Sequence, residues 1–258
     1  MFDGSWSRPV GTGGGKVLHW EGKAGLIGAV TPTIDRHSAV MGALGERFVL
    51  YRLADSDEDN TKSRRSLENF GHQDQMRAEL AEAAKNVLVG IGRYEPKPLT
   101  NDDKDRLTRV AGFVVRARTA VERDGYRRTV EALPEWEHAT RLVQQLAQLR
   151  AGLLEIGAGS DTAWRIVIKA GLDSIPRLRW KILNALRDAD YSLSTGELVT
   201  ATGIPSKTLV EHAEDLQLLG LINRVKTAEH KTAPWTHNLS EVALEAWPQE
   251  LRKKSREG

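Results

Sequence analysis

The section that most constrains the fold is GELVTATGIPSKTLVEHAEDLQLLGLINRVK, residues 196–226. It contains two helical patterns separated by a short turn at Gly203, where glycine adopts a left-handed backbone conformation without strain. Pro205 suits the first turn of the second helix, and Gly220 suits the point where that helix ends. Three leucines are spaced to pack the second helix onto the first: Leu209, Leu216 and Leu219.

The flanking sequence extends this pattern over residues 176–250. PRLRWKILNALRDA predicts an amphipathic helix, and YSLS predicts a short strand after it. Further on, LINRVKT and WTHNL predict two strands joined by the polar loop AEHKTAP, and SEVALEAW predicts a final helix. This order of helices, strands and a loop resembles the winged helix-turn-helix domains of the MarR and ArsR kind.

The resemblance implies double-stranded DNA as a partner, because the second helix of such domains enters the major groove with its first residues against bases or phosphates. Cations of the wing would neutralise phosphates and make the affinity depend on salt. Glu211, Glu214 and Asp215 make this helix less basic, so contact with a protein partner remains an alternative. The implied contact residues are Ser206, Lys207, Thr208 and His212 on the helix, and Arg224, Lys226, His230 and Lys231 on the wing.

Near the start of the chain, GTGGGKV is rich in glycine but does not fit the phosphate-binding loop G-x-x-x-x-G-K-[ST]. Its first glycine would fall on Val10, and the hydroxyl that holds magnesium would fall on Val17. We therefore expect a hairpin tip here, followed by a short strand over residues 17–20.

GLIGAVT (25–31), followed by a helical pattern and LGERFVLYRL (44–53), resembles the later part of an AAA+ ATPase core. The apolar run predicts a buried strand of a parallel sheet, and RFVLYRL predicts another strand. The resemblance implies that Thr31 orients the attacking water and that Arg47 is an arginine finger, with Arg52 as a second candidate. Such an arginine neutralises charge on the γ-phosphate in the transition state.

Helical patterns dominate residues 67–175 and predict a bundle. Thr100 and Asp103 have the spacing of a capping box at the start of one helix. The helix EWEHATRLVQQLAQLRAGL is similar to the lid helix of AAA+ proteins, which implies Arg141 as a second sensing arginine. The helices are expected at about 69–91, 101–123, 135–156 and 161–171.

Each residue of this ATPase set also has an ordinary structural explanation. Thr31 can simply end a strand, Arg47 can be one of many surface arginines, and Arg141 can be solvated on an amphipathic helix. The sequence shows neither a phosphate-binding loop nor an acidic strand end that would hold magnesium. We therefore expect no cofactor to bind this chain alone, and ATP and Mg to bind only with a companion ATPase half.

The composition is that of one or two globular domains, with 258 residues, 40% apolar and 28% charged. A net charge of +2 means that any contact with nucleic acid must come from a local patch. The absence of cysteine excludes disulfides and thiolate zinc sites and agrees with the cytoplasm. We expect no signal peptide and no membrane contact, since apolar runs stay short of the ~20 residues that cross a bilayer.

The expected architecture is mainly α with small β elements. It comprises a partial, P-loop-type α/β core (1–53), a linker (54–66), a lid-like helical bundle (67–175), a winged helix (176–250) and a basic tail (251–258).

Two functional interpretations follow. The chain is a DNA-binding C-terminal fragment of a helicase-like AAA+ ATPase of phage or mobile-element type, inactive alone, which acts with a companion subunit or by self-association. Alternatively, it is a stand-alone winged-helix transcriptional regulator with an N-terminal structural or dimerisation domain.

Overall fold

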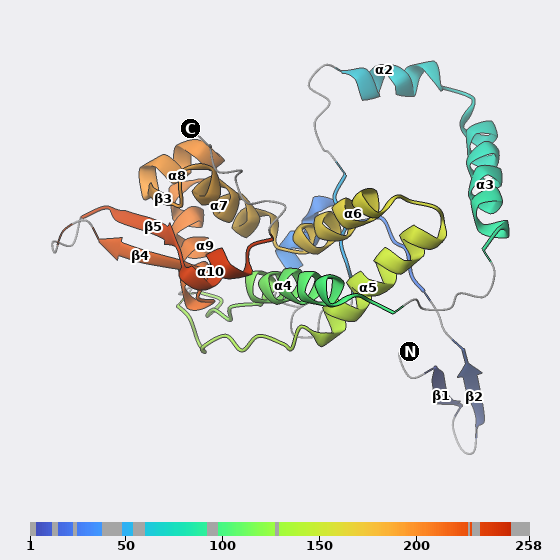
Figure 1. The fold of residues 1–258 in the computed structure, drawn as a ribbon, viewed down its shortest axis with the longest axis horizontal. Coiled ribbons are helices and arrows are strands. Elements are labelled where there is room, and N and C mark those ends of the chain that lie inside the picture. The colour runs from blue at the N-terminus through green and yellow to red at the C-terminus, as the bar shows by residue number, and fades with distance from the viewer. Residues whose placement is uncertain are drawn as a thin grey trace. The chain divides into compact units, whose positions relative to one another are not determined.

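The computed structural model describes residues 4–11, 15–22, 25–37, 48–53, 60–91, 98–126, 129–226, 228 and 233–248. It is mainly helical, with two small antiparallel sheets (Figure 1). The chain divides into two compact units, residues 1–36 and 37–258. Among the described residues, no helix combines the length and apolar character needed to cross a membrane.

The first unit begins with a β-hairpin of β1 (Ser5–Val10) and β2 (Lys16–Glu21). The hairpin and the strand expected over 17–20 are therefore confirmed. Gly15 is needed for close backbone approach, because a Cβ at this position would lie 2.0 Å from the carbonyl oxygen of Val10.

The prediction of a buried strand at 25–31 is wrong. These residues are irregular, and the Ile27 side chain is 100% exposed. Thr31 is exposed too, and its carbonyl accepts a hydrogen bond from the amide of Ile34 in the short 3-10 helix η1 (Pro32–His37). A strand needs neighbours that satisfy its backbone groups, and both sheets of the described part of the chain are antiparallel and lie elsewhere.

Residues 48–53 form no strand either, but lie against the end of α6 (Ser160–Asp173). The Leu50 amide donates to the Ser174 hydroxyl at 3.0 Å, and the Arg52 amide donates to the Asp173 carboxylate at 2.7 Å. The guanidinium of Arg52 donates to the carbonyl of Asp173 at 2.8 Å. The segment thus satisfies groups that a helix leaves unpaired at its C-terminus.

Residues 61–66 of the expected linker are helical and belong to α2 (Thr61–Glu68), and residues 54–59 lie outside the described part of the chain. The structure then continues with α3 (Gln73–Val89), as expected. Neither helix contains a buried residue.

A three-helix bundle is formed by α4 (Asn101–Arg118), α5 (Thr140–Glu155) and α6. The capping box of Thr100 and Asp103 is confirmed, with the Asp103 amide 3.1 Å from the Thr100 hydroxyl. The helix that it begins is shorter than expected and ends at Arg118. Its buried face contains Leu107, Val110, Val114 and Val115.

The C-terminal section has the order of elements predicted from the sequence. They are α7 (Arg177–Asp188), β3 (Ser192–Ser194), α8 (Thr195–Thr202), α9 (Ser206–Leu218), β4 (Ile222–Lys226), β5 (Trp235–Leu239) and α10 (Glu241–Ala246). The three strands form one antiparallel sheet in the order β3-β5-β4. Gly203 and Gly220 have φ values of 66° and 70°, which explains glycine at both turns.

The bundle and the C-terminal section share one hydrophobic core. Trp247, after α10, packs edge-on against Phe113 of α4 with ring centroids 5.0 Å apart. The same indole stacks on Trp180 of α7 at 5.7 Å. Because aromatic pairs of this kind add to the burial of large surfaces, they hold the two groups of helices together.

His237 is fully buried on the central strand β5. Its Nε2 lies 2.9 Å from the hydroxyl of Thr195 at the start of α8. Burial, together with the positive charge of Arg224, lowers the pKa of His237 to about 4. The imidazole is therefore neutral in the folded protein at pH values where it would be charged in the unfolded chain.

Acidification is expected to destabilise the protein between pH 6.5 and about 4 through His237. When the pKa of a group is lower in the folded than in the unfolded state, its contribution to stability is fully present at pH values above the unfolded pKa. This contribution is lost as the pH falls toward the folded pKa. The difference between the folded and unfolded pKa values corresponds to a loss of about 3 kcal/mol in the free energy of unfolding, at about 1.4 kcal/mol per pKa unit. Thermal melts of wild type and His237→Gln across this range measure it, and equal losses of Tm would contradict the assignment.

Candidate nucleic-acid interface

The start of α9 presents polar side chains to solvent. Ser206 and Lys207 are exposed, and Thr208 is half-buried. Among the described residues, no side chain caps this end of the helix, which begins after Pro205. The opposite face is buried through Leu209, Ala213 and Leu216. The core thus fixes the rotation of α9 about its axis and leaves the side chains of its first turn facing solvent.

The hairpin of β4 and β5 adds positive charge beside α9. Arg224 and Lys226, both on β4, lie over the ring of Trp235 at 4.7 Å and 5.4 Å. Cations held on an indole face lose less conformational freedom on binding an anion than freely rotating side chains do. The other expected wing residues, His230 and Lys231, lie outside the described residues.

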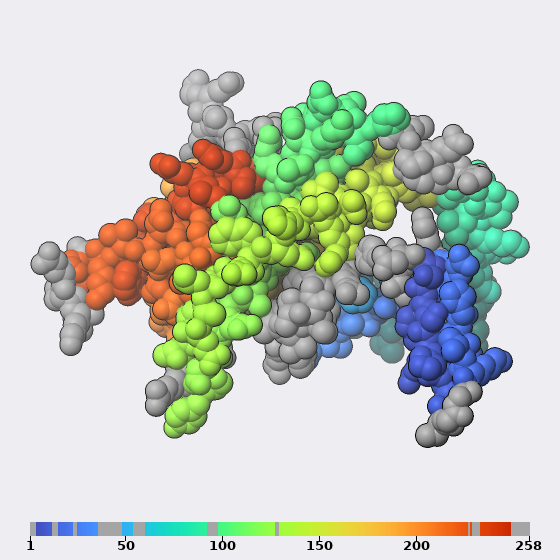
Figure 2. All heavy atoms as spheres, turned by 90° about the horizontal axis from the view of Figure 1, so that it is seen from below, coloured from blue at the N-terminus to red at the C-terminus, as the bar shows by residue number. Residues whose placement is uncertain are grey.

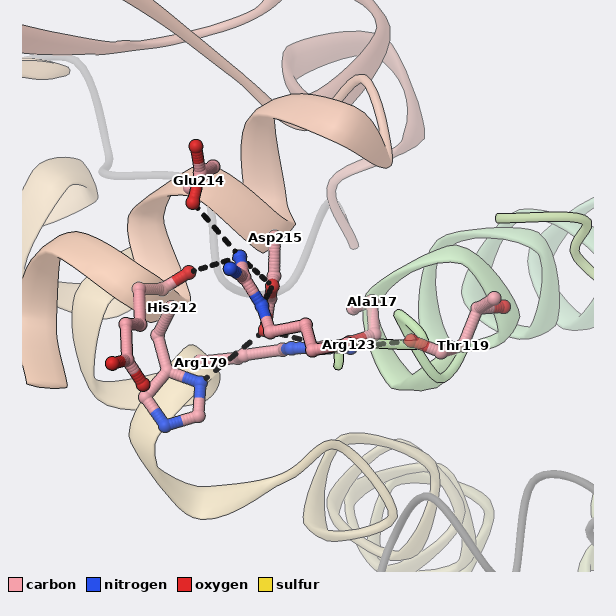
Figure 3. Close-up of polar contacts among 8 residues, drawn as sticks. Ala117, Thr119, Arg123, Arg179, His212, Glu214 and Asp215 are labelled. Atoms are coloured by element: carbon pink, nitrogen blue, oxygen red, sulfur yellow. Dashed lines mark hydrogen bonds and ion pairs between the residues drawn. The ribbon is translucent and has the colours of Figure 1, made fainter. Parts of the chain in front are cut away.

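Two acidic residues of α9, Glu214 and Asp215, are bound by arginines from other elements (Figure 3). The guanidinium of Arg123 lies 2.6 Å from the Asp215 carboxylate and 3.0 Å from that of Glu214. Arg179 of α7 binds the second oxygen of Asp215 at 3.1 Å. Asp215 is only 7% exposed, so its charge is directed inward rather than toward a ligand.

The charge state of Asp215 follows from these neighbours. Burial alone would raise its pKa, but His212, Arg179 and Arg123 together lower it to about 2. The Nδ1 of His212 is 3.7 Å from the carboxylate, which is too long for a hydrogen bond, so the two arginines dominate. His212 therefore faces Asp215, on a different side of α9 from the exposed Lys207.

Arg179 also fixes α9 relative to the bundle. Its guanidinium donates to the carbonyls of Ala117 at 3.1 Å and Thr119 at 2.6 Å, at the C-terminal end of α4. A cation is favoured there because the last carbonyls of a helix are unpaired and carry partial negative charge. One buried side chain thus connects the end of α4 to the C-terminal half of α9.

Arg123 comes from the connection between α4 and α5, residues 119–139, which the sequence did not indicate as part of this site. Figure 2 shows the connection, in yellow-green, projecting from the surface beside the orange C-terminal section. Hydrogen bonds between backbone groups of Asp124 and Thr129, and of Glu122 and Glu131, order it. In the sequence, this partner was indicated by Asp215 alone, because a carboxylate on the buried side of a helix requires a cation to pair with.

Each candidate ATPase residue that the structure describes has its own local surroundings. Thr31 belongs to the first unit, and Arg47 lies outside the described residues. Arg52 is engaged at the end of α6. Arg141 is 39% exposed and lies 3.5 Å from Glu137, which also pairs with the buried Arg118. In the part of the chain that the structure describes, no His, Asp and Glu side chains gather into a potential metal site.

The chain was compared with protein-family models, with curated proteins and with solved structures. Nothing matches it. Function is therefore inferred from the geometry of its own residues.

Removing the Asp215 carboxylate is expected to destabilise the fold strongly. Asp215→Ala would leave the guanidinium groups of Arg123 and Arg179 without this partner, which costs about 3–5 kcal/mol for a buried ion pair. Urea unfolding measures the loss. Asp74→Ala is the matched control, because the ion pair of Asp74 with Arg77 is exposed and contributes little to stability. Equal losses in the two variants would show that the cluster does not hold α9.

Proposed function

We propose that residues 176–250 form a winged helix-turn-helix domain that binds double-stranded DNA. The order of elements and the strand order β3-β5-β4 support this fold. In the proposed complex, α9 lies in the major groove and the β4–β5 hairpin lies along the phosphate backbone. A helix about 10–12 Å across fits a groove about 12 Å wide.

The observation that carries the proposal is the pairing of two acidic residues of α9 with arginines of the same fold. Two of its three carboxylates, those of Glu214 and Asp215, are bound by Arg123 and Arg179. The exposed start of the helix instead presents Ser206 and Lys207. The helix is therefore less repulsive to phosphates than its sequence suggests.

The contacts of the proposed complex divide by type. Lys207, Arg224 and Lys226 neutralise phosphates, which positions the domain without reading sequence. Ser206 and Thr208 are short donors at the start of the helix, where base edges are within reach. The implied role of Lys231 remains a prediction.

The same DNA-binding domain would serve a fragment of a helicase-like AAA+ ATPase or a stand-alone transcriptional regulator. The ATPase interpretation remains a proposal that depends on Arg47 and on a companion half that supplies ATP and Mg. The irregular, exposed segment 25–31 gives it no support.

Charge reversal at Lys207 or Arg224 is expected to weaken duplex binding about tenfold, because each removes a charge-assisted hydrogen bond to phosphate. The slope of log affinity against log salt should also decrease by about 1 for each phosphate that is no longer neutralised. Fluorescence anisotropy with a labelled duplex measures both quantities.

Lys85→Glu on the exposed helix α3 is the matched control, because it changes the net charge by the same amount. Lys85 also lies far from the proposed contacts in the sequence. If Lys207→Glu and Lys85→Glu weaken binding to the same extent, α9 does not face DNA.

The purified chain is expected to release no phosphate from ATP, because its sequence has no phosphate-binding loop. A coupled phosphate assay measures this, with ATP and magnesium present. Turnover that disappears in Arg47→Ala would overturn the expectation of an incomplete ATPase site.

A further inference from the structure

The β1–β2 hairpin has two faces of different chemistry. Residues opposite each other in an antiparallel pair lie on the same face, and alternate residues of a strand share a face. One face contains the pairs Trp6 and Trp20, Arg8 and Leu18, and Val10 and Lys16. The other contains Ser5 and Glu21, Ser7 and His19, and Pro9 and Val17.

The first of these faces, here called the tryptophan face, is open to solvent. Trp6 is 43% exposed and Leu18 is 46% exposed, and Trp20 is half-buried. A lone two-stranded hairpin is marginally stable in water, and a cross-strand aromatic pair such as Trp6 and Trp20 adds about 0.2–1 kcal/mol to it. The pair therefore stabilises the hairpin modestly, while part of its indole surface stays open to a ligand.

Charge is also sorted between the two faces. Arg8 and Lys16 lie on the tryptophan face, whereas the acidic Glu21 lies on the other. His19 is directed to that other face as well, where its Nδ1 lies 2.7 Å from the Ser7 hydroxyl. The tryptophan face thus combines aromatic rings with positive charge and has no carboxylate from either strand.

We propose that the tryptophan face binds a single strand of nucleic acid. Bases would stack on Trp6 and Trp20, and phosphates would lie near Arg8 and Lys16. Unpaired bases can stack on indole rings because every base has an exposed π-face. Cations beside the rings bind the phosphate backbone of the same strand. The bases of a duplex are already stacked on each other, so this surface selects single strands. The proposal does not depend on duplex binding by α9.

The dimensions of the hairpin agree with such a ligand. Alternate residues along a β-strand are about 6.7 Å apart. This is about twice the ~3.4 Å axial rise per nucleotide of one stacked strand. The tryptophan pair and the two cations would therefore meet different nucleotides of the same strand.

The test measures binding of the full chain to a fluorescein-labelled oligothymidylate by anisotropy, with a duplex of equal length as a second probe. Trp6→Ala or Trp20→Ala is expected to raise the Kd for the single strand about fivefold or more. Arg8→Gln and Lys16→Gln keep both indoles, and each should lower the salt slope by about 0.7. These two variants keep the test valid if an alanine at a tryptophan position unfolds the hairpin.

Val17→Thr is the matched control on the opposite face, because it keeps a β-branched side chain at a position that is 59% exposed. It should leave the Kd unchanged. The proposal is overturned if the wild type fails to bind the single strand, or if Arg8→Gln and Lys16→Gln bind it like wild type. The second outcome would indicate that the tryptophan face binds a protein partner instead. Lys207→Glu separates the two sites, since it should weaken duplex binding and leave single-strand binding intact.

Discussion

The buried carboxylate of Asp215 is the point through which the helical bundle determines the position of α9. It accepts hydrogen bonds from Arg179 of α7 and from Arg123 of the α4–α5 connection. Arg179 in turn binds carbonyls at the end of α4. A buried charge is costly unless it is paired, so this arrangement specifies one placement of α9 rather than merely adding stability.

The shared core reinforces this placement. Trp247 fills the space between α4 and α7, in contact with Phe113 and Trp180. The bundle predicted as a separate lid and the C-terminal section predicted as a separate domain are thus packed as one body. The α4–α5 connection lies against the same helix through Arg123 and so belongs to the same body.

The two proposed nucleic-acid surfaces use different physics. In the proposal for α9 and β4, fixed cations and short polar donors would meet the grooves and phosphates of a duplex. In the proposal for the hairpin of the first unit, indole rings would stack with unpaired bases. A chain with both could hold a duplex and a single strand at once, which agrees with either a motor-associated or a regulatory role on DNA.

The sequence by itself determined those features of the fold that depend on residues close together in the chain. The capping box at Thr100, the turns at Gly203 and Gly220, and the order of elements after residue 176 depend on interactions within a few residues or on allowed φ values. These features could be predicted because their causes are local.

Tertiary structure alone decided what depends on distant partners. The apolar run 25–31 looked like a strand, but a strand exists only where neighbouring strands accept its hydrogen bonds. Likewise, Arg123 and Asp215 are 92 residues apart in sequence, so no local pattern could show that the acidity of α9 is neutralised from within. Pairing across such distances is set by how the helices pack, and only the folded chain reveals it.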